Sequence, residues 1–181
     1  MRAGIRRRVD HGAPAPAAAY TARDSPAAGL APRAGGFAVS TSSIDACPCG
    51  RADAKGRPLA YSACCGRYLD ASPESGVTAP DAEALMRSRY TAFVRQQAGY
   101  LLATWHPAHR PATLDFDPGA KWLGLQVRSH RVTGPDTAEV EFVARHRAAG
   151  RAVRLHERSR FVREPVRGVA RWLYLDGDIL E

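Results

Sequence analysis

The stretch WLGLQVRSHRVTGPDTAEVEFVARHR, residues 122–147, decides the fold class. Apolar and polar residues alternate with a period of two on both sides of Gly134-Pro135-Asp136, and this alternation is typical of strands with one buried face. A turn this short joins neighbouring antiparallel strands. The stretch therefore predicts two strands, 122–132 and 137–147, that pair as a hairpin.

Two further segments with the same period follow this hairpin. They predict strands over residues 152–164 and 170–180, separated by turn-forming segments at 148–150 and 165–168. Four strands joined by such short turns form an antiparallel meander. We therefore expect the C-terminal part of the chain to be a single curved sheet.

Helical periodicity precedes the strands. Thr78, with Asp81 three residues later, resembles a capping signal, and GYLLATW (99–105) is typical of a short helix that ends before Pro107. The apolar positions of the first helix recur at three- and four-residue steps: Ala82, Leu85, Met86, Tyr90, Phe93 and Val94. Helices followed by a meander predict an α+β domain, with the first helix on one face of a twisted sheet and a concave end suited to a ligand.

All four cysteines lie between residues 47 and 69, in CPCGRADAKGRPLAYSACCGRYL. Cys47, Cys49, Cys64 and Cys65 supply the four thiolates that a structural zinc site takes, and grouped cysteines in a reducing compartment are more often metal ligands than disulfides. We expect these four residues to bind zinc, with iron as the alternative metal. Four thiolates leave no open coordination position, so the site is expected to be structural or a docking surface.

Charge and composition argue against nucleic-acid binding and membrane insertion as functions of this chain. The chain has 181 residues and a net charge of +8, and half of this excess lies in residues 1–40, so no dedicated nucleic-acid groove is indicated. Residues 1–44, rich in alanine, proline and arginine, are predicted to be a disordered tail, and the sequence leaves open a natural start near Val39. No segment approaches the roughly 20 apolar residues of a membrane-spanning helix, and no secretory signal is present. We therefore expect a cytoplasmic protein without membrane insertion.

CPCG followed by YSACCGRYL resembles the SEC-C type metal-binding motif, in which C-x-C precedes a Cys-Cys or Cys-His pair. That motif also occurs at the C-terminus of the Sec translocase motor protein. The segments EALMRSRYTAFV (83–94), YLLATWHPAHRP (100–111) and RWLYLDGDI (171–179) resemble the bacterial YchJ-like family, a group without an established biochemical role. The resemblance covers about residues 45–181.

The resemblance implies a metal-binding motif over residues 45–70 joined to a domain over 78–181 that is similar to nuclear transport factor 2 (NTF2-like), a cone of curved antiparallel sheet and helices. The sequence departs from the family pattern in two places. The segment GRADAKGRPLAYSA between the cysteine pairs is longer than the usual compact loop, and no second cysteine motif follows at the C-terminus.

No nucleophile elbow, phosphate loop or second metal constellation appears in the larger domain. Consecutive strand residues point to opposite faces, so His156 and Glu157 cannot form a dyad, whereas Glu141 can meet one of them across the hairpin. If the cone has a pocket, we expect its lining to include Arg89, Trp105, Glu141 and His156.

These observations favour a non-enzymatic adaptor that uses the metal-binding motif to dock a protein partner. The Sec resemblance suggests, by analogy, a partner in protein export or at the ribosome. The alternative is a small-ligand binder or enzyme that uses the cavity of the cone domain. Nucleic-acid binding through the arginines is the least favoured of the three functions.

Overall fold

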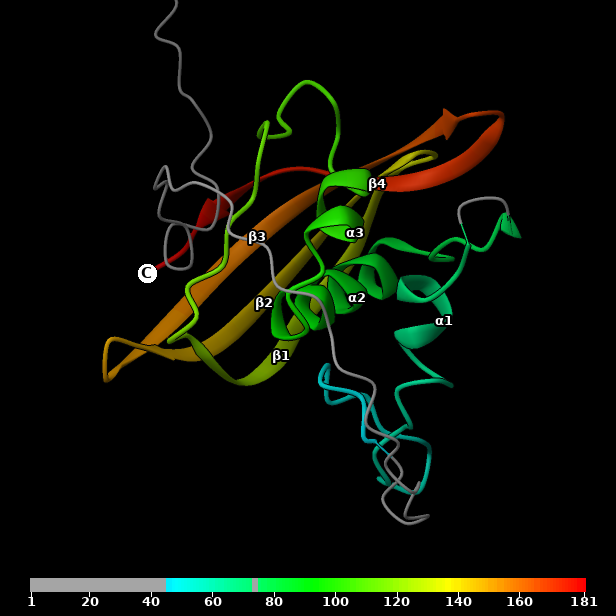
Figure 1. The fold of residues 1–181 in the computed structure, drawn as a ribbon. Coiled ribbons are helices and arrows are strands. Elements are labelled where there is room, and N and C mark those ends of the chain that lie inside the picture. The colour runs from blue at the N-terminus through cyan, green and yellow to red at the C-terminus, as the bar shows by residue number, and fades with distance from the viewer. Residues whose placement is uncertain (1–44, 73–74) are drawn as a thin grey trace, which may run out of the picture.

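The computed structural model describes residues 45–72 and 75–181, and Figure 1 shows a long, twisted sheet with the helices gathered on one of its faces. The tail predicted over residues 1–44 lies outside the described residues. The elements are α1 (Gly66–Leu69), α2 (Ala82–Val94), α3 (Ala98–Ala103), β1 (Lys121–Gly134), β2 (Thr137–Ala148), β3 (Arg151–Val166) and β4 (Val169–Ile179). The predicted α+β class with a curved antiparallel sheet is confirmed.

The four strands form one antiparallel sheet in the order β1-β2-β3-β4. The two later hairpins turn at Ala149-Gly150 and Arg167-Gly168, and all four of these residues have positive φ, between 47° and 79°. Two consecutive residues of this conformation form the type of turn that matches the twist of paired strands, and glycine adopts it without steric strain. Local turn chemistry therefore sets the register of the meander.

The third turn differs from the sequence-based prediction. Strand β3 runs through Pro165 to Val166, and Pro165 pairs with Ala170 of β4. A proline interrupts a central strand because it lacks an N–H group. Strand β2 pairs with β3 only as far as Val162, so beyond that point β3 has a neighbour on one side and Pro165 is tolerated.

Irregular pairing curves the sheet. Strand β1 shifts register against β2 at three places, one of them beside Gly124, and a further shift occurs between β3 and β4 at Arg160/Phe161. Each bulge bends its strand and increases the local twist. The sheet is therefore concave on the face that receives helix α2.

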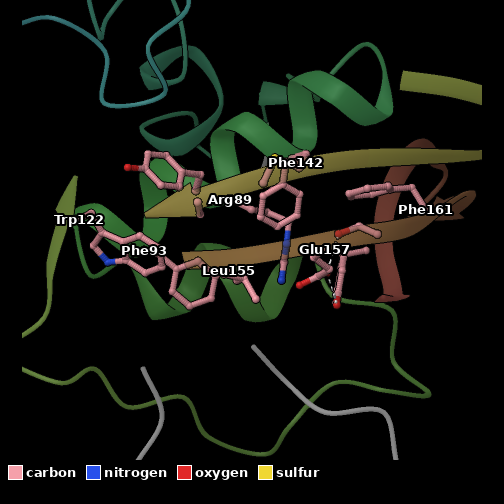
Figure 2. Close-up of a pocket in the computed structure, with 12 residues that line it drawn as sticks. Arg89, Phe93, Trp122, Phe142, Leu155, Glu157 and Phe161 are labelled. Carbon is pink, nitrogen blue, oxygen red and sulfur yellow. Dashed lines mark hydrogen bonds between the residues drawn. The ribbon is translucent and has the colours of Figure 1, made fainter. Parts of the chain in front are cut away.

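Helix α2 begins at Ala82, and its N-cap is Asp81, whose Oδ1 accepts a hydrogen bond from the backbone N–H of Ala84 at 2.7 Å. The sequence-based assignment of Thr78 as the cap is therefore wrong. The helix packs into the concave face of the sheet, where Trp122 of β1 lies against Phe93 with ring centroids 5.8 Å apart (Figure 2).

The end of helix α3 is attached to strand β4 by backbone hydrogen bonds. The N–H of Tyr174 donates to the carbonyl of Thr104 at 2.9 Å, and the N–H of His106 donates to the carbonyl of Tyr174 at 2.8 Å. Trp105, between them, is buried against the Tyr174 ring with centroids 5.2 Å apart. These bonds fix α3 on the sheet and place Trp105 beneath α2.

One contiguous buried cluster joins the cysteine segment, helix α2 and the sheet. It includes Cys49 and Cys65, then Leu85 of α2, then Val140 and Phe161 of the sheet. Segments far apart in sequence thus share one core.

Within residues 45–72 and 75–181, no helix has the length and apolar character needed to cross a membrane.

Replacing Asp81 by alanine should lower the free energy of unfolding by about 1 kcal/mol, because an N–H at the start of α2 loses its acceptor. Asp81→Asn should retain most of the stability, since asparagine also caps helices. Urea unfolding of the intact chain measures both effects. A larger loss for Thr78→Ala than for Asp81→Ala would contradict this assignment of the cap.

Candidate functional site

The first pair of cysteines lies on a tight turn held by backbone hydrogen bonds. The N–H of Cys47 donates to the carbonyl of Leu59 at 2.8 Å, and the N–H of Gly50 donates back to the carbonyl of Cys47 at 3.1 Å. Gly50 has a φ of 69°, a left-handed conformation that glycine adopts without strain. The turn directs Cys47 and Cys49 to the same side.

The second pair immediately precedes helix α1. The N–H groups of Cys64 and Gly66 both donate to the carbonyl of Tyr61, at 3.0 and 2.8 Å. A Cβ atom on Gly66 would lie 2.9 Å from that carbonyl oxygen and 2.8 Å from the Tyr61 ring. Gly66 is therefore required by close approach of the backbone to Tyr61, and this approach orients Cys64 and Cys65.

The long segment between the two pairs forms a compact side turn. Asp53 accepts hydrogen bonds through Oδ1 from the N–H groups of Lys55 and Arg57, at 2.8 and 3.0 Å. Isolated β-bridges join Ala52 to Pro58 and Ala46 to Ala60. The additional residues project as this turn, and the two cysteine pairs still meet at its base.

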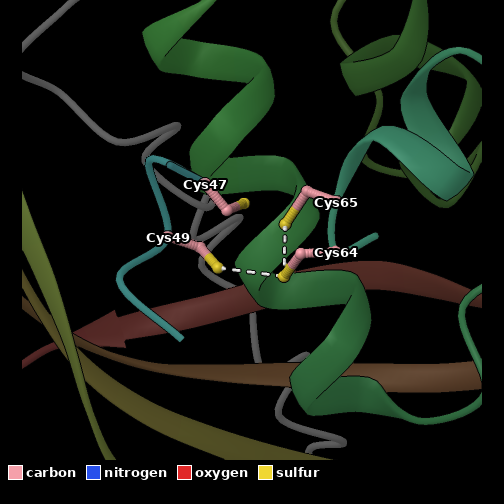
Figure 3. A group of neighbouring side chains, drawn as sticks. All are labelled: Cys47, Cys49, Cys64 and Cys65. Atoms are coloured by element: carbon pink, nitrogen blue, oxygen red, sulfur yellow. Dashed lines mark hydrogen bonds between the residues drawn. The ribbon is translucent and has the colours of Figure 1, made fainter. Parts of the chain in front are cut away.

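Figure 3 shows the four cysteine side chains converging on one point. Their sulfur atoms all lie within 4.8 Å of one another, with Cys49 and Cys64 3.6 Å apart and Cys64 and Cys65 4.0 Å apart. Tetrahedral zinc with sulfur ligands at about 2.3 Å places the sulfurs about 3.8 Å apart. All four cysteines are buried, and their donor set and spacing fit a four-coordinate thiolate metal.

Helix α2 supports the cysteine cluster from one side. Arg87 donates to the carbonyl of Cys49 at 3.2 Å and to Glu83 at 2.7 Å, and Glu83 also pairs with Arg51 at 3.4 Å. The Cys47 sulfur lies 3.9 Å from the Thr91 hydroxyl. The position of the cluster is therefore tied to the helix that packs on the sheet.

The thiols differ in their readiness to lose a proton. Hydrogen bonds from Cys49 and Cys65 hold the pKa of Cys47 well below its usual range. Burial raises the pKa of Cys64 to about 12, and the hydrogen bond to Cys47 raises the pKa of Cys65. A dication stabilises every thiolate it contacts, so metal binding should release protons from the other cysteines.

The structure separates the four residues predicted to line a pocket. Arg89 extends from α2 into a cavity of about 50 Å³ between that helix and the sheet, and Trp105 lies beside the Arg89 guanidinium, 5.0 Å from it. Trp105 itself is outside the cavity lining, and so are Glu141 and His156. Glu141 and His156 contact each other across the β2–β3 hairpin, with Nε2 and Oε1 2.8 Å apart, which confirms the predicted cross-strand contact.

Strand alternation explains why Glu141 and His156 are not in the cavity. Phe142 and Glu157, their immediate neighbours, face each other across the hairpin and line the cavity, so Glu141 and His156 point to the opposite face of the sheet. Glu157 is the cavity residue that the predicted set lacks. A period of two from Leu155 through Glu157 to Phe161 is the signal that identifies it.

Glu157 is almost fully buried, with 4% of its surface exposed, and burial raises its pKa. Its Oε1 accepts hydrogen bonds from the Ser159 hydroxyl at 2.6 Å and the Tyr174 hydroxyl at 3.1 Å. Arg89 is also buried, and burial lowers its pKa to about 10. The cavity therefore contains a cation and an acid removed from water.

A family model, proteins of similar sequence and a solved structure all match this chain. Residues 81–177 match the family model described as YchJ, middle NTF2-like domain. A UPF0225 protein of Polaromonas naphthalenivorans is 66% identical to this chain, and the match covers 73% of this chain and 96% of the relative. A UPF0225 protein of Polaromonas sp. is 63% identical, and the match covers 73% of this chain and 91% of the relative. The crystal structure of a sec-c motif containing protein from Psychrobacter arcticus has a TM-score of 0.64 and 32% identity, covering 77% of this chain and 85% of that one.

Removal of metal with a strong chelator should expose the four thiols and unfold residues 45–70 while the sheet remains folded, because a four-thiolate metal supplies folding free energy locally. Thiol titration and hydrogen exchange report the two effects. The double variant Cys64→Ser, Cys65→Ser should carry little metal and behave like the chelated protein. Unchanged thiol reactivity and circular dichroism after chelation would disprove the metal site.

Glu157 should make stability depend on pH. Its pKa is higher in the folded protein than in the unfolded chain, so the stabilisation is fully present below the unfolded pKa of about 4.3 and is lost as pH rises through the folded pKa. The loss is at most about 1.4 kcal/mol per pH unit across this window. Glu157→Gln should lack this slope. Because the two proteins differ only at position 157, the difference between their urea unfolding curves isolates the contribution of Glu157. A stability difference that grows in favour of the wild type with rising pH would contradict the burial effect.

Proposed function

The chain belongs to the YchJ-like family, together with its UPF0225 relatives, and from this premise we propose that it is a metal-binding adaptor that docks a protein partner and is not an enzyme. The observation that carries the proposal is the convergence of four buried cysteines on one point, supported by helix α2. Zinc is the proposed metal, with iron as the alternative, because tetrahedral thiolate sites accept both.

The chemistry of the site supports docking over catalysis. A catalytic zinc keeps a coordination position for water or substrate, whereas four protein thiolates fill a tetrahedral shell. A metal bound by Cys47, Cys49, Cys64 and Cys65 holds two distant chain segments together and makes their outer surface rigid. Rigid surfaces lose less conformational entropy when they bind a partner.

A cleft of about 140 Å³ opens beside Cys64 and Cys65 and is the proposed docking surface. Its lining includes Arg51, Arg67 and Arg87, three arginines within one small area. Arg87 and Arg51 share the carboxylate of Glu83, while Arg67 is exposed and stacks on Tyr68. An acidic segment of a partner protein complements this charge, and arginine and tyrosine are frequent anchors at interfaces.

The SEC-C type motif suggests where such a partner acts. The structural neighbour from Psychrobacter arcticus is a sec-c motif containing protein. The cysteine segment of this chain resembles the SEC-C type motif, which also occurs at the C-terminus of the Sec translocase motor protein. We therefore place the partner in protein export or at the ribosome, and the protein in the cytoplasm, by analogy between motifs.

Capture experiments with the metal-loaded chain test the proposal. Proteins retained by the intact chain and lost by the Cys64→Ser, Cys65→Ser variant are the candidates, and their affinity is then measured with purified material. Charge reversal by Arg51→Glu with Arg67→Glu should weaken binding at least about tenfold, because it places like charges against the acidic segment.

A matched control reverses two exposed arginines away from the cleft, Arg128→Glu with Arg163→Glu, and should change the affinity less than about twofold. Equal loss in both pairs of variants would indicate a nonspecific effect of net charge. An unchanged set of captured proteins in the cysteine variant would exclude the motif as the docking site.

A further inference from the structure

The cavity between helix α2 and the sheet is lined mainly by apolar and aromatic side chains, into which a few polar groups project (Figure 2). Phe93, Trp122 and Leu155 form its apolar part, and Arg89 and Glu157 its charged part. Its volume of about 50 Å³ gives room for roughly four water-sized groups. A small cavity of this composition has the character of a binding site for a small amphipathic molecule.

Arg89 is held in one orientation by its surroundings. Its Nη1 donates hydrogen bonds to the carbonyl of Leu101 and the hydroxyl of Thr104, both at 2.8 Å. The guanidinium lies 4.7 Å from the Tyr174 ring and 5.0 Å from the Trp105 ring. Both side-chain hydrogen bonds of Arg89 within the described residues come from Nη1, so the Nε and Nη2 donors of a fixed cation remain for another group.

Glu157 is also fixed, and the sheet provides space for it. Both of its hydrogen bonds, from Ser159 and Tyr174, end on Oε1, and Oε2 has no partner in the described part of the chain. A Cβ atom on Gly177 of the neighbouring strand would overlap the Glu157 carboxyl group. Glycine at position 177 therefore leaves the room that this carboxyl group occupies.

Arg89 and Glu157 line the same cavity but do not neutralise each other by contact. No ion pair within 4.0 Å joins them, although other arginines of the described residues, such as Arg160 with Asp178 at 2.6 Å, form close pairs. Buried charges are normally paired, since an isolated charge in a protein interior is strongly unfavourable. Because both side chains line one cavity, a group bound in it can satisfy both of them.

We propose that this cavity binds a small organic carboxylate, with the carboxylate group between Arg89 and Glu157 and the apolar part against Phe93 and Trp122. Arginine recognises carboxylates through paired N–H donors, and the charge of the ligand compensates that of the buried guanidinium. Burial raises the pKa of Glu157, and in its protonated form Oε2 donates a hydrogen bond to the ligand. This site is separate from the cysteine motif and does not depend on the proposed docking function.

Propionate and its isosteric neutral analogue propionamide are the probes. With the metal-loaded, full-length chain, propionate should bind with a dissociation constant on the order of 1 mM or tighter, measured by NMR titration, and propionamide at least about tenfold more weakly. This comparison uses the unaltered protein, so it decides the question even where a variant does not fold. Equal affinity for the two probes, or no binding of propionate, would overturn the proposal.

Three variants locate the site. Arg89→Gln removes the cation and Ala144→Leu fills the cavity, so each should weaken propionate binding at least about tenfold while circular dichroism shows a folded protein. Glu157→Gln keeps the acceptor for Ser159 and Tyr174 and offers an N–H to the ligand, so it should bind propionate at least as tightly as the wild type. Undiminished binding in a folded Ala144→Leu protein, or weaker binding in Glu157→Gln, would contradict this site.

Discussion

Helix α2 packs against a different partner on each side, and the remainder of the structure depends on this arrangement. One side carries Arg87, which contacts the cysteine turn through the carbonyl of Cys49, and the other carries Arg89, which enters the cavity above the sheet. Leu85 is almost fully buried between these layers, and burying a leucine contributes about 1.5–3 kcal/mol. A helix constrained on both sides fixes the distance between the cysteine cluster and the cavity, so the two sites belong to one folded unit.

The two sites differ in how they satisfy buried polar groups. The cysteine cluster has four sulfur donor atoms around one point, an arrangement that a single cation satisfies completely. The cavity has a cation and an acid on different elements, each anchored by its own hydrogen bonds, with no direct ion pair between them. A cation suits the first site and a small anion suits the second.

Particular residues show how much could be predicted. Periodicity predicts the four strands and both main helices to within three residues of their ends, because alternation and three-to-four-residue spacing are local properties of the chain. The prediction of four cysteine ligands rests on the number of cysteines, on their grouping in a reducing compartment and on the resemblance to the SEC-C type motif. Errors occurred where a neighbour decides the outcome: Asp81 caps α2 in place of Thr78, and Pro165 lies within β3 because β2 has already ended. Glu141 and His156 were assigned to the pocket although strand alternation directs them to the other face.

The sequence by itself determined the fold class, the order of the strands and the set of sulfur atoms that fits a metal, since these follow from local pattern and residue chemistry. Only the tertiary structure decided which charged residues are removed from water. The sequence predicts Arg89 in the pocket lining but not Glu157, and the two become a candidate binding site because the curvature of the sheet brings its concave face around α2. The local period of two predicts the face of the sheet on which Glu157 lies, whereas its burial depends on the positions of many residues at once.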